Sequence, residues 1–95
     1  MRFLITWTFK GSEADQTRIL DLFAKWQPPV ELREWSGFAD GSGGMCLAET
    51  DDVGILAAIT APWTPWLDFT VRALQPIQQA AEAMAAAAGF RASIA

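Results

Sequence analysis

The sequence predicts an α+β domain with a ferredoxin-like split βαβ plan, in which an antiparallel sheet is followed by an added C-terminal helix. Three observations predict it: an alternating apolar segment at the start, helical spacing of apolar residues after it, and a glycine-rich turn between two short apolar runs. A chain of 95 residues has the size of one small domain. We therefore expect a single domain over residues 1–95.

The first two elements follow directly from periodicity. In residues 2–9, Phe3, Ile5, Trp7 and Phe9 fall on one side, which predicts a strand. Ser12, with an aspartate three residues later, is typical of a helix cap. The apolar residues that follow recur at helical spacing, so we expect a helix of about 14 residues, ended by the Pro28–Pro29 pair.

The rest of the chain also divides into predicted strands and helices. Residues 30–38 and 44–50 predict paired strands, because the turn at 40–43 is rich in glycine. The acidic pair Asp51–Asp52 predicts the start of a second helix that ends near Thr60. Residues 67–74 predict the last strand. The alanine-rich stretch 76–88, with Gly89 as its C-cap, predicts a third helix packed on the surface.

The two faces of this sheet differ in character. On the last strand, Leu67, Phe69, Val71 and Ala73 can meet the helices. The opposite face is mixed and consists of Leu4, Thr6, Thr8, Asp68, Thr70, Arg72 and Leu74. Hydrophobic residues make up 52% of the chain and charged residues 19%, more apolar character than so small a domain can bury alone. We therefore expect a homodimer whose two sheets close into a barrel.

Composition argues against several classes of partner. The net charge is −4 and the seven basic residues are scattered singly, so we expect no nucleic-acid partner. The first apolar run is broken by Thr6, Thr8 and Lys10, which predicts neither an export signal nor a membrane span. The single Cys46 cannot form an internal disulfide, which favours a cytoplasmic location.

Most of the candidate functional residues are aromatic. Trp63 and Trp66 lie on a short segment that Pro62 and Pro65 stiffen, and we expect this segment to close one end of an apolar pocket. Trp7 and Phe69, on the inward faces of their strands, are expected to form the pocket floor. The candidate ligand-binding residues are therefore Trp7, Trp63, Trp66, Phe69 and Asp68.

Two of the candidates have competing interpretations. Asp68 can act as a general base if it is buried against the tryptophans, whereas a structural pairing with Arg72 is the favoured alternative. Cys46 is interpreted as a small buried hydrophobe, with a catalytic thiol as the alternative. Trp26 and Trp35 are interpreted as structural.

Cofactor and metal chemistry finds little support in the sequence. With no histidine in the chain, haem ligation by His and a catalytic zinc site are not expected. The adjacent carboxylates Asp51 and Asp52 are interpreted as helix caps, and the glycines at 41–44 as a turn and not a phosphate loop. We predict no cofactor and no metal.

Four segments resemble an uncharacterised bacterial family, the domain of unknown function 3303, within the dimeric α+β barrel superfamily. They are Thr6-Trp7-Thr8-Phe9-Lys10, Pro28-Pro29, Glu49-Thr50-Asp51-Asp52 and Trp66-Leu67-Asp68-Phe69-Thr70-Val71. The resemblance implies the dimeric barrel fold and no assigned activity. The wider superfamily includes cofactor-independent monooxygenases, haem-degrading enzymes and lactone isomerases, so it implies a pocket between sheet and helices.

Three hypotheses for function stay open at this stage. The first is a homodimer that holds a small apolar or aromatic molecule between sheet and helices. The second is a cofactor-independent monooxygenase- or isomerase-like enzyme in which Asp68 or Cys46 handles a proton. The third is a purely structural dimer with a filled core. The size and lining of any cavity between the helices and the sheet separate them.

Overall fold

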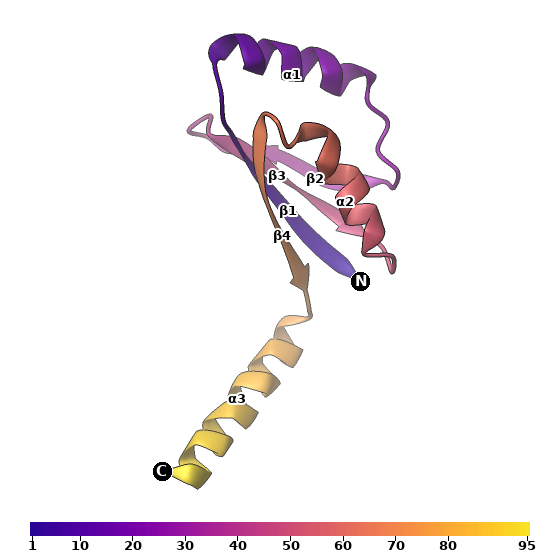
Figure 1. Ribbon diagram of the computed structural model, residues 1–95. Coiled ribbons are helices and arrows are strands. Elements are labelled where there is room, and N and C mark those ends of the chain that lie inside the picture. Colours follow the sequence, from indigo (N-terminus) through magenta and orange to yellow (C-terminus); the bar gives the residue numbers. More distant parts are fainter.

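The computed structural model describes residues 1–95 as one four-stranded antiparallel sheet with three α-helices (Figure 1). The elements follow the order βαββαβα, as predicted. They are β1 (Arg2–Phe9), α1 (Glu13–Lys25), β2 (Leu32–Gly37), β3 (Gly43–Glu49), α2 (Gly54–Thr60), a short 3₁₀ helix η1 (Ala61–Trp63), β4 (Leu67–Leu74) and α3 (Ile77–Ile94).

The strand order in the sheet is β2-β3-β1-β4, and every neighbouring pair is antiparallel. This order confirms the ferredoxin-like plan, with β1 and β3 in the centre. The register pairs Trp7 of β1 with Gly44 of β3 on one side and with Phe69 of β4 on the other. The three residues therefore lie in one row across the face that carries the helices.

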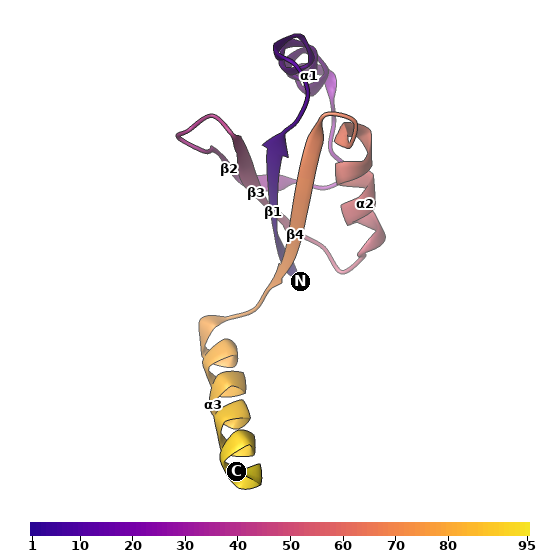
Figure 2. The ribbon, with the colours of Figure 1, turned by 60° about the vertical axis from the view of Figure 1, so that its left-hand side comes forward.

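Both α1 and α2 cover the same face of the sheet but at different ends of it (Figures 1 and 2). Under α2 lies a cluster of five buried residues, which are Ile5, Leu32, Cys46, Ala48 and Ile59. Under α1 lies a second cluster, in which Ile19 packs with Trp63 and Leu67. The core is thus divided between the two helices.

The predicted cap of α1 is present in full. The backbone N–H of Asp15 donates to the Ser12 hydroxyl, and the backbone N–H of Ser12 donates to the Asp15 carboxylate at 3.0 Å. These hydrogen bonds from Ser12, the backbone one first, lower the pKa of the Asp15 carboxyl below its ordinary value. At α2, the Asp52 carboxylate accepts from Gly54 N–H at 2.9 Å, although the helix itself begins one residue later than expected.

The prediction that α3 packs on the domain surface is wrong. None of its residues is buried, and the helix projects away from the end of the sheet opposite α1 (Figures 1 and 2). It also runs straight through Gly89 to Ile94 instead of ending there. Gln75 and Pro76 are the only residues between β4 and α3, and extended backbone at Pro76 carries the chain onward in the direction of β4.

Candidate functional site

The candidate site is a cavity between α1 and the sheet with a volume of about 190 Å³. All 11 residues that line it are hydrophobic. They are Ile5, Trp7, Phe9, Ile19, Leu20, Phe23, Trp35, Cys46, Trp63, Leu67 and Phe69. The site is therefore apolar on every wall.

Large rings hold α1 away from the sheet. Trp26, just after α1, meets Trp63 edge to face, with ring centroids 5.3 Å apart. Phe23 of α1 makes the same kind of contact with Trp35 of β2 at 5.4 Å, and Trp35 meets Trp7 of β1 at 5.9 Å. Such pairs stabilise by about 0.5–1.5 kcal/mol each beyond their buried area. Trp7, Phe23, Trp35 and Trp63 line the cavity, and Trp26 supports Trp63 from behind.

Gly44 makes room for the Trp7 indole. A Cβ atom on Gly44 would lie 2.7 Å from Trp7 Cζ2 and 2.6 Å from the Ser36 carbonyl oxygen, distances that real Cβ atoms do not adopt. Because Gly44 and Trp7 are cross-strand partners, the indole lies over the glycine and reaches toward β2. A glycine at this row of the sheet therefore positions one wall of the cavity.

A β-bulge turns Trp35 toward the cavity. In the β2–β3 pairing, Arg33 faces Leu47 and Ser36 faces Met45, so two residues of β2, Glu34 and Trp35, lie opposite the single residue between them on β3. Glu34 adopts a φ of 57°, a left-handed conformation that a residue with a Cβ rarely takes. Bulges of this kind redirect a side chain and recur beside functional sites. Here the bulge brings Trp35 onto the face that carries the helices.

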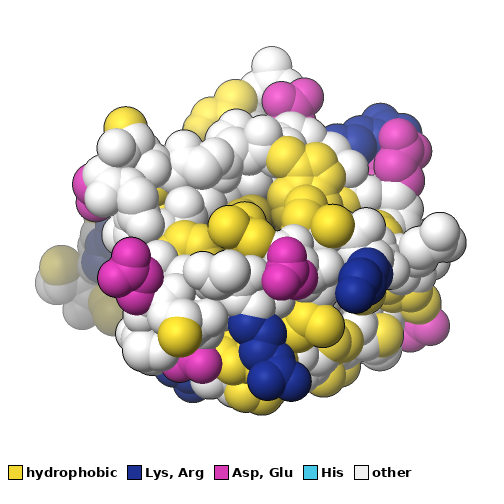
Figure 3. All heavy atoms as spheres, turned by 90° about the horizontal axis from the view of Figure 1, so that it is seen from above, with side chains coloured by type: hydrophobic (Ala, Val, Ile, Leu, Met, Phe, Trp, Pro, Cys, Tyr) yellow, Lys and Arg dark blue, Asp and Glu magenta, His cyan; other side chains and the backbone are white.

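The mouth of the cavity lies at the surface. Leu20 is 68% exposed, and Phe23 and Trp35 are exposed by close to half, although all three line the cavity. Seen from the α1 end, hydrophobic side chains reach the surface among acidic and basic ones (Figure 3). The cavity floor, in contrast, includes Ile5 and Cys46, each only 1% exposed.

The structure brings three of the five candidate residues together. Trp7, Trp63 and Phe69 all line the cavity. Trp63 does so from a buried position, because the segment 61–63 is a 3₁₀ helix that directs its indole inward, and not an open lid. The other two candidates, Trp66 and Asp68, are not brought to the cavity.

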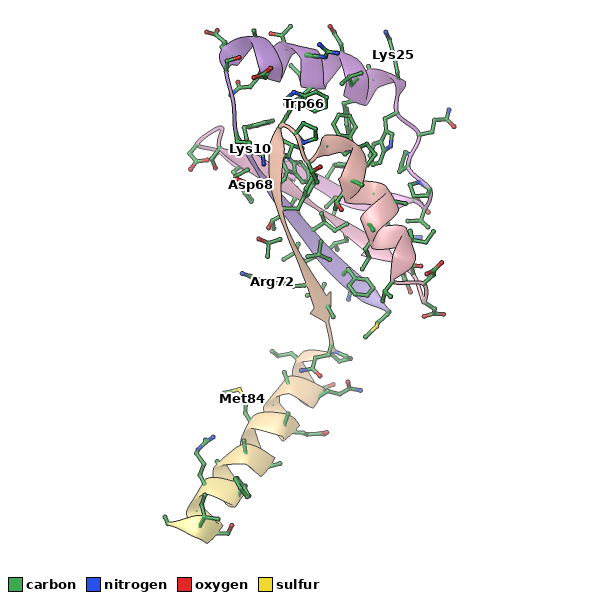
Figure 4. All side chains as sticks on the ribbon, in the orientation of Figure 1. Lys10, Lys25, Trp66, Asp68, Arg72 and Met84 are labelled. Atoms are coloured by element: carbon green, nitrogen blue, oxygen red, sulfur yellow. The ribbon has the colours of Figure 1, made fainter.

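Asp68 lies on the opposite face of the sheet, where its side chain is 68% exposed and forms an ion pair of 3.2 Å with Lys10 (Figure 4). The expected pairing with Arg72 is therefore wrong. Lys10 follows directly on β1, and Thr8 and Asp68 are cross-strand partners, so the lysine reaches Asp68 more readily than Arg72 does from farther down β4. An exposed, paired carboxylate on this face is not placed to act on a molecule in the cavity.

Cys46 is the one ionisable side chain that lines the cavity. Burial raises the pKa of its thiol from 9.0 to about 11, so the group stays protonated near neutral pH. This environment fits the interpretation of Cys46 as a small buried hydrophobe. No cluster of three or more His, Cys, Asp or Glu residues is arranged to hold a metal ion.

Several lining residues were not among the sequence candidates, above all Trp35, Phe23 and Leu20. The helical spacing of residues 19, 22 and 23 of α1, and of Trp26 just after it, marked one helix face as apolar but gave no sign that the helix stands off the sheet. No local pattern in the sequence identified Trp35 as a lining residue. Simple alternation along β2 would place its side chain on the sheet face that no helix covers. Only the bulge at Glu34 changes that assignment.

Comparison with protein families shows where the chain belongs. The model of the family described as Domain of unknown function (DUF3303) matches residues 1–88, so the chain is a member of this family. A search of curated proteins found no match. None of the helices combines the length and the apolar character needed to cross a membrane.

Proposed function

We propose that this protein binds a small, neutral, apolar or aromatic molecule in the cavity between α1 and the sheet. The observation that supports the proposal is a cavity of about 190 Å³, open to the surface at its mouth, that only hydrophobic side chains line. An engineered apolar cavity of about 150 Å³ stays dry and admits benzene, so a space of this size suits one or two fused rings.

The lining also limits the kind of molecule. A charged ligand would lose its hydration without gaining a partner, at a cost of several kcal/mol. A flat ring gains edge-to-face contacts with Trp7 and Trp63, which lie on two different walls. A neutral aromatic hydrocarbon is therefore the best-suited class of ligand.

The enzymatic alternative, a cofactor-independent monooxygenase- or isomerase-like protein, would need a proton acceptor at the wall. The available group is the thiol of Cys46, and its pKa of about 11 disfavours that role at neutral pH. The favoured function is accordingly binding. The third alternative, a purely structural dimer with a filled core, is the outcome in which no small molecule enters between α1 and the sheet.

The test is a titration with naphthalene, followed by tryptophan fluorescence and by the midpoint of thermal unfolding, with benzoate as the charged control. We expect naphthalene to change the emission and to raise the midpoint, and benzoate to do neither. Cys46→Leu should fill part of the cavity and weaken naphthalene binding at least tenfold. Met45→Leu, one residue away on the opposite face, is the matched control and should leave it unchanged. Equal responses to the two molecules would contradict the proposal.

We also infer that the protein is a cytoplasmic homodimer paired through the sheet face that no helix covers. Leu4, Leu47 and Leu74 lie on that face and are only partly buried in the single chain. Pairing two such faces would remove this apolar surface from water and give the barrel arrangement. The cytoplasmic placement is supported by the single cysteine, which is free and buried.

Leu74→Glu should weaken or abolish this dimer, because it would bury a carboxylate without a partner. Gln75→Glu, the next residue and part of the linker before α3, is the matched control and should leave the dimer intact. Sedimentation equilibrium on the two variants measures the effect. A wild-type chain that sediments as a monomer at micromolar concentration would contradict the homodimer.

A further inference from the structure

The C-terminal helix α3 has no partner within its own chain. It spans 18 residues, and none of them is buried. Ile77 is 81% exposed and Met84 is 73% exposed, and Figure 4 shows Met84 pointing into open space, away from the rest of the domain. Large apolar side chains on an isolated helix indicate a surface that is covered in the working molecule.

An isolated helix of this length is only marginally stable in water. Isolated helices of this size are marginal even when rich in alanine, and the interior Gly89 costs about 1 kcal/mol more. Glu82 and Arg91 are the only charged side chains on α3, and their spacing does not form a stabilising pair. Packing against another surface is therefore needed to stabilise α3.

The exposed area and the radius of gyration of the chain both exceed those of a compact domain of the same size. A compact chain of 10.4 kDa exposes roughly 5,400 Å², whereas this one exposes 6770 Å². Its radius of gyration is 17.5 Å, against about 12 Å for a compact domain of this length. The excess of roughly 1,400 Å² is more than the 800 Å² or so that each partner buries in a standard interface.

α3 follows closely on the strand that carries part of the uncovered sheet face. Leu74 ends β4 on that face, and Ile77 begins α3 after a linker of two residues. Ile77, Ala81, Met84 and Ala88 share one stripe of the helix, with Gln78 and Glu82 beside it. Phe90 and Ile94 are exposed on the opposite side, so apolar side chains face solvent around most of α3. The partly apolar sheet face and the exposed helix are thus separated by only two residues of the chain.

We propose that α3 is a dimerisation arm that packs against a second copy of this chain. The proposal rests on the homodimer inferred above and adds a second contact to it. The extended linker directs α3 away from its own sheet, so the arm reaches past its own domain. In a two-fold dimer each copy supplies one arm and receives the other, and such an exchange is a low-cost route to a dimer.

The test uses the full-length chain and three variants. Met84→Glu places a charge in the stripe of Ile77 and Met84, and Met84→Ala shortens the side chain while keeping a strong helix former. Gln79→Glu, the matched control, places the same charge on the side of α3 away from Met84. Sedimentation equilibrium gives each dimer dissociation constant. Circular dichroism and tryptophan emission check that the domain is folded.

We expect the wild-type chain and Gln79→Glu to form equally stable dimers of twice the 10.4 kDa chain mass. Met84→Glu should raise the dissociation constant at least a hundredfold, and Met84→Ala by a smaller factor. A Met84→Glu dimer as stable as Gln79→Glu would overturn the arm and leave the sheet-face dimer standing. A wild-type monomer with a radius of gyration near 12 Å, in which α3 folds back on its own sheet, would overturn both. Naphthalene binding by either species is a separate readout that tests the cavity alone.

Discussion

The two ends of the helix-bearing sheet face are built from different residues and pack differently. Under α2 the side chains are small or aliphatic, such as Ala48 and Ile59, and they form a filled core. Under α1 the side chains are mostly aromatic, and Trp63 and Phe23 hold the helix away from the sheet and leave a cavity. Rigid rings that meet edge to face fill the space between them less completely than flexible aliphatic chains do. A single sheet face thus carries both a filled and a hollow half.

The strongest test of this difference is Trp63→Ala in the hollow half. Trp63 is only 6% exposed and contacts both Phe23 and Trp26. We expect the free energy of unfolding to fall by about 4 kcal/mol, because the indole is one of the spacers that hold α1 in place. Urea denaturation measures it, and Trp66→Ala, outside the cavity lining, should cost clearly less. Equal losses would mean that the two tryptophans are equivalent in packing.

Ile59→Ala tests the filled half. Ile59 is 3% exposed and packs on the sheet beneath α2. Its truncation should lower the free energy of unfolding by about 3 kcal/mol, through lost burial and a new void. The neighbouring Ala58→Gly, at an exposed position of the same helix, should cost about 1 kcal/mol. Naphthalene affinity should stay unchanged in Ile59→Ala, and a large change would mean that the two halves are not independent.

Cys46 lies on the border between the halves and gives the protein a pH dependence. Its thiol has a pKa of about 11 when folded and 9.0 when exposed, so the unfolded chain loses the proton first as the pH rises. The contribution of the protonated thiol to the free energy of unfolding is therefore complete below pH 9. About 2 kcal/mol of it is lost as the pH rises from 9 to about 11. Thermal unfolding of the wild type and of Cys46→Ala across this range should diverge by that amount. Parallel pH profiles would contradict the raised pKa.

The smallest expected effect concerns the bulge that directs Trp35 into the hollow half. Asparagine tolerates the left-handed conformation of Glu34 better than glutamate does, so Glu34→Asn should raise the free energy of unfolding by about 0.5 kcal/mol. Arg33→Asn, at the ordinary strand position before it, should show no gain. A loss in Glu34→Asn would mean that the glutamate side chain itself stabilises the bulge.

The filled half and the order of elements follow from local patterns that sequence reveals. Alternation at Phe3, Ile5 and Trp7, and the cap at Ser12, identify their elements because each signal depends only on neighbouring residues. The hollow half depends on contacts between distant segments. The distance between α1 and the sheet is set by rings from four separate elements, and the face of Trp35 by a bulge, and neither leaves a local pattern.

The same limit explains the errors at α3 and Asp68. The alanine-rich stretch correctly predicted a helix, but local sequence does not show whether a helix packs on its own chain or on another one. Asp68 was expected to pair with Arg72 along its own strand, whereas it forms its ion pair with Lys10, which directly follows the neighbouring strand β1. Both errors concern the partner of a residue or element, and not its secondary structure.

A crystal of this protein held under xenon pressure tests the central claim most directly, because xenon enters empty apolar cavities. We predict electron density for xenon between α1 and the sheet, bounded by Trp7, Trp63 and Phe69, and none beneath α2. Density under α2, or no density in either half, would contradict the division of this sheet face into a filled and a hollow half.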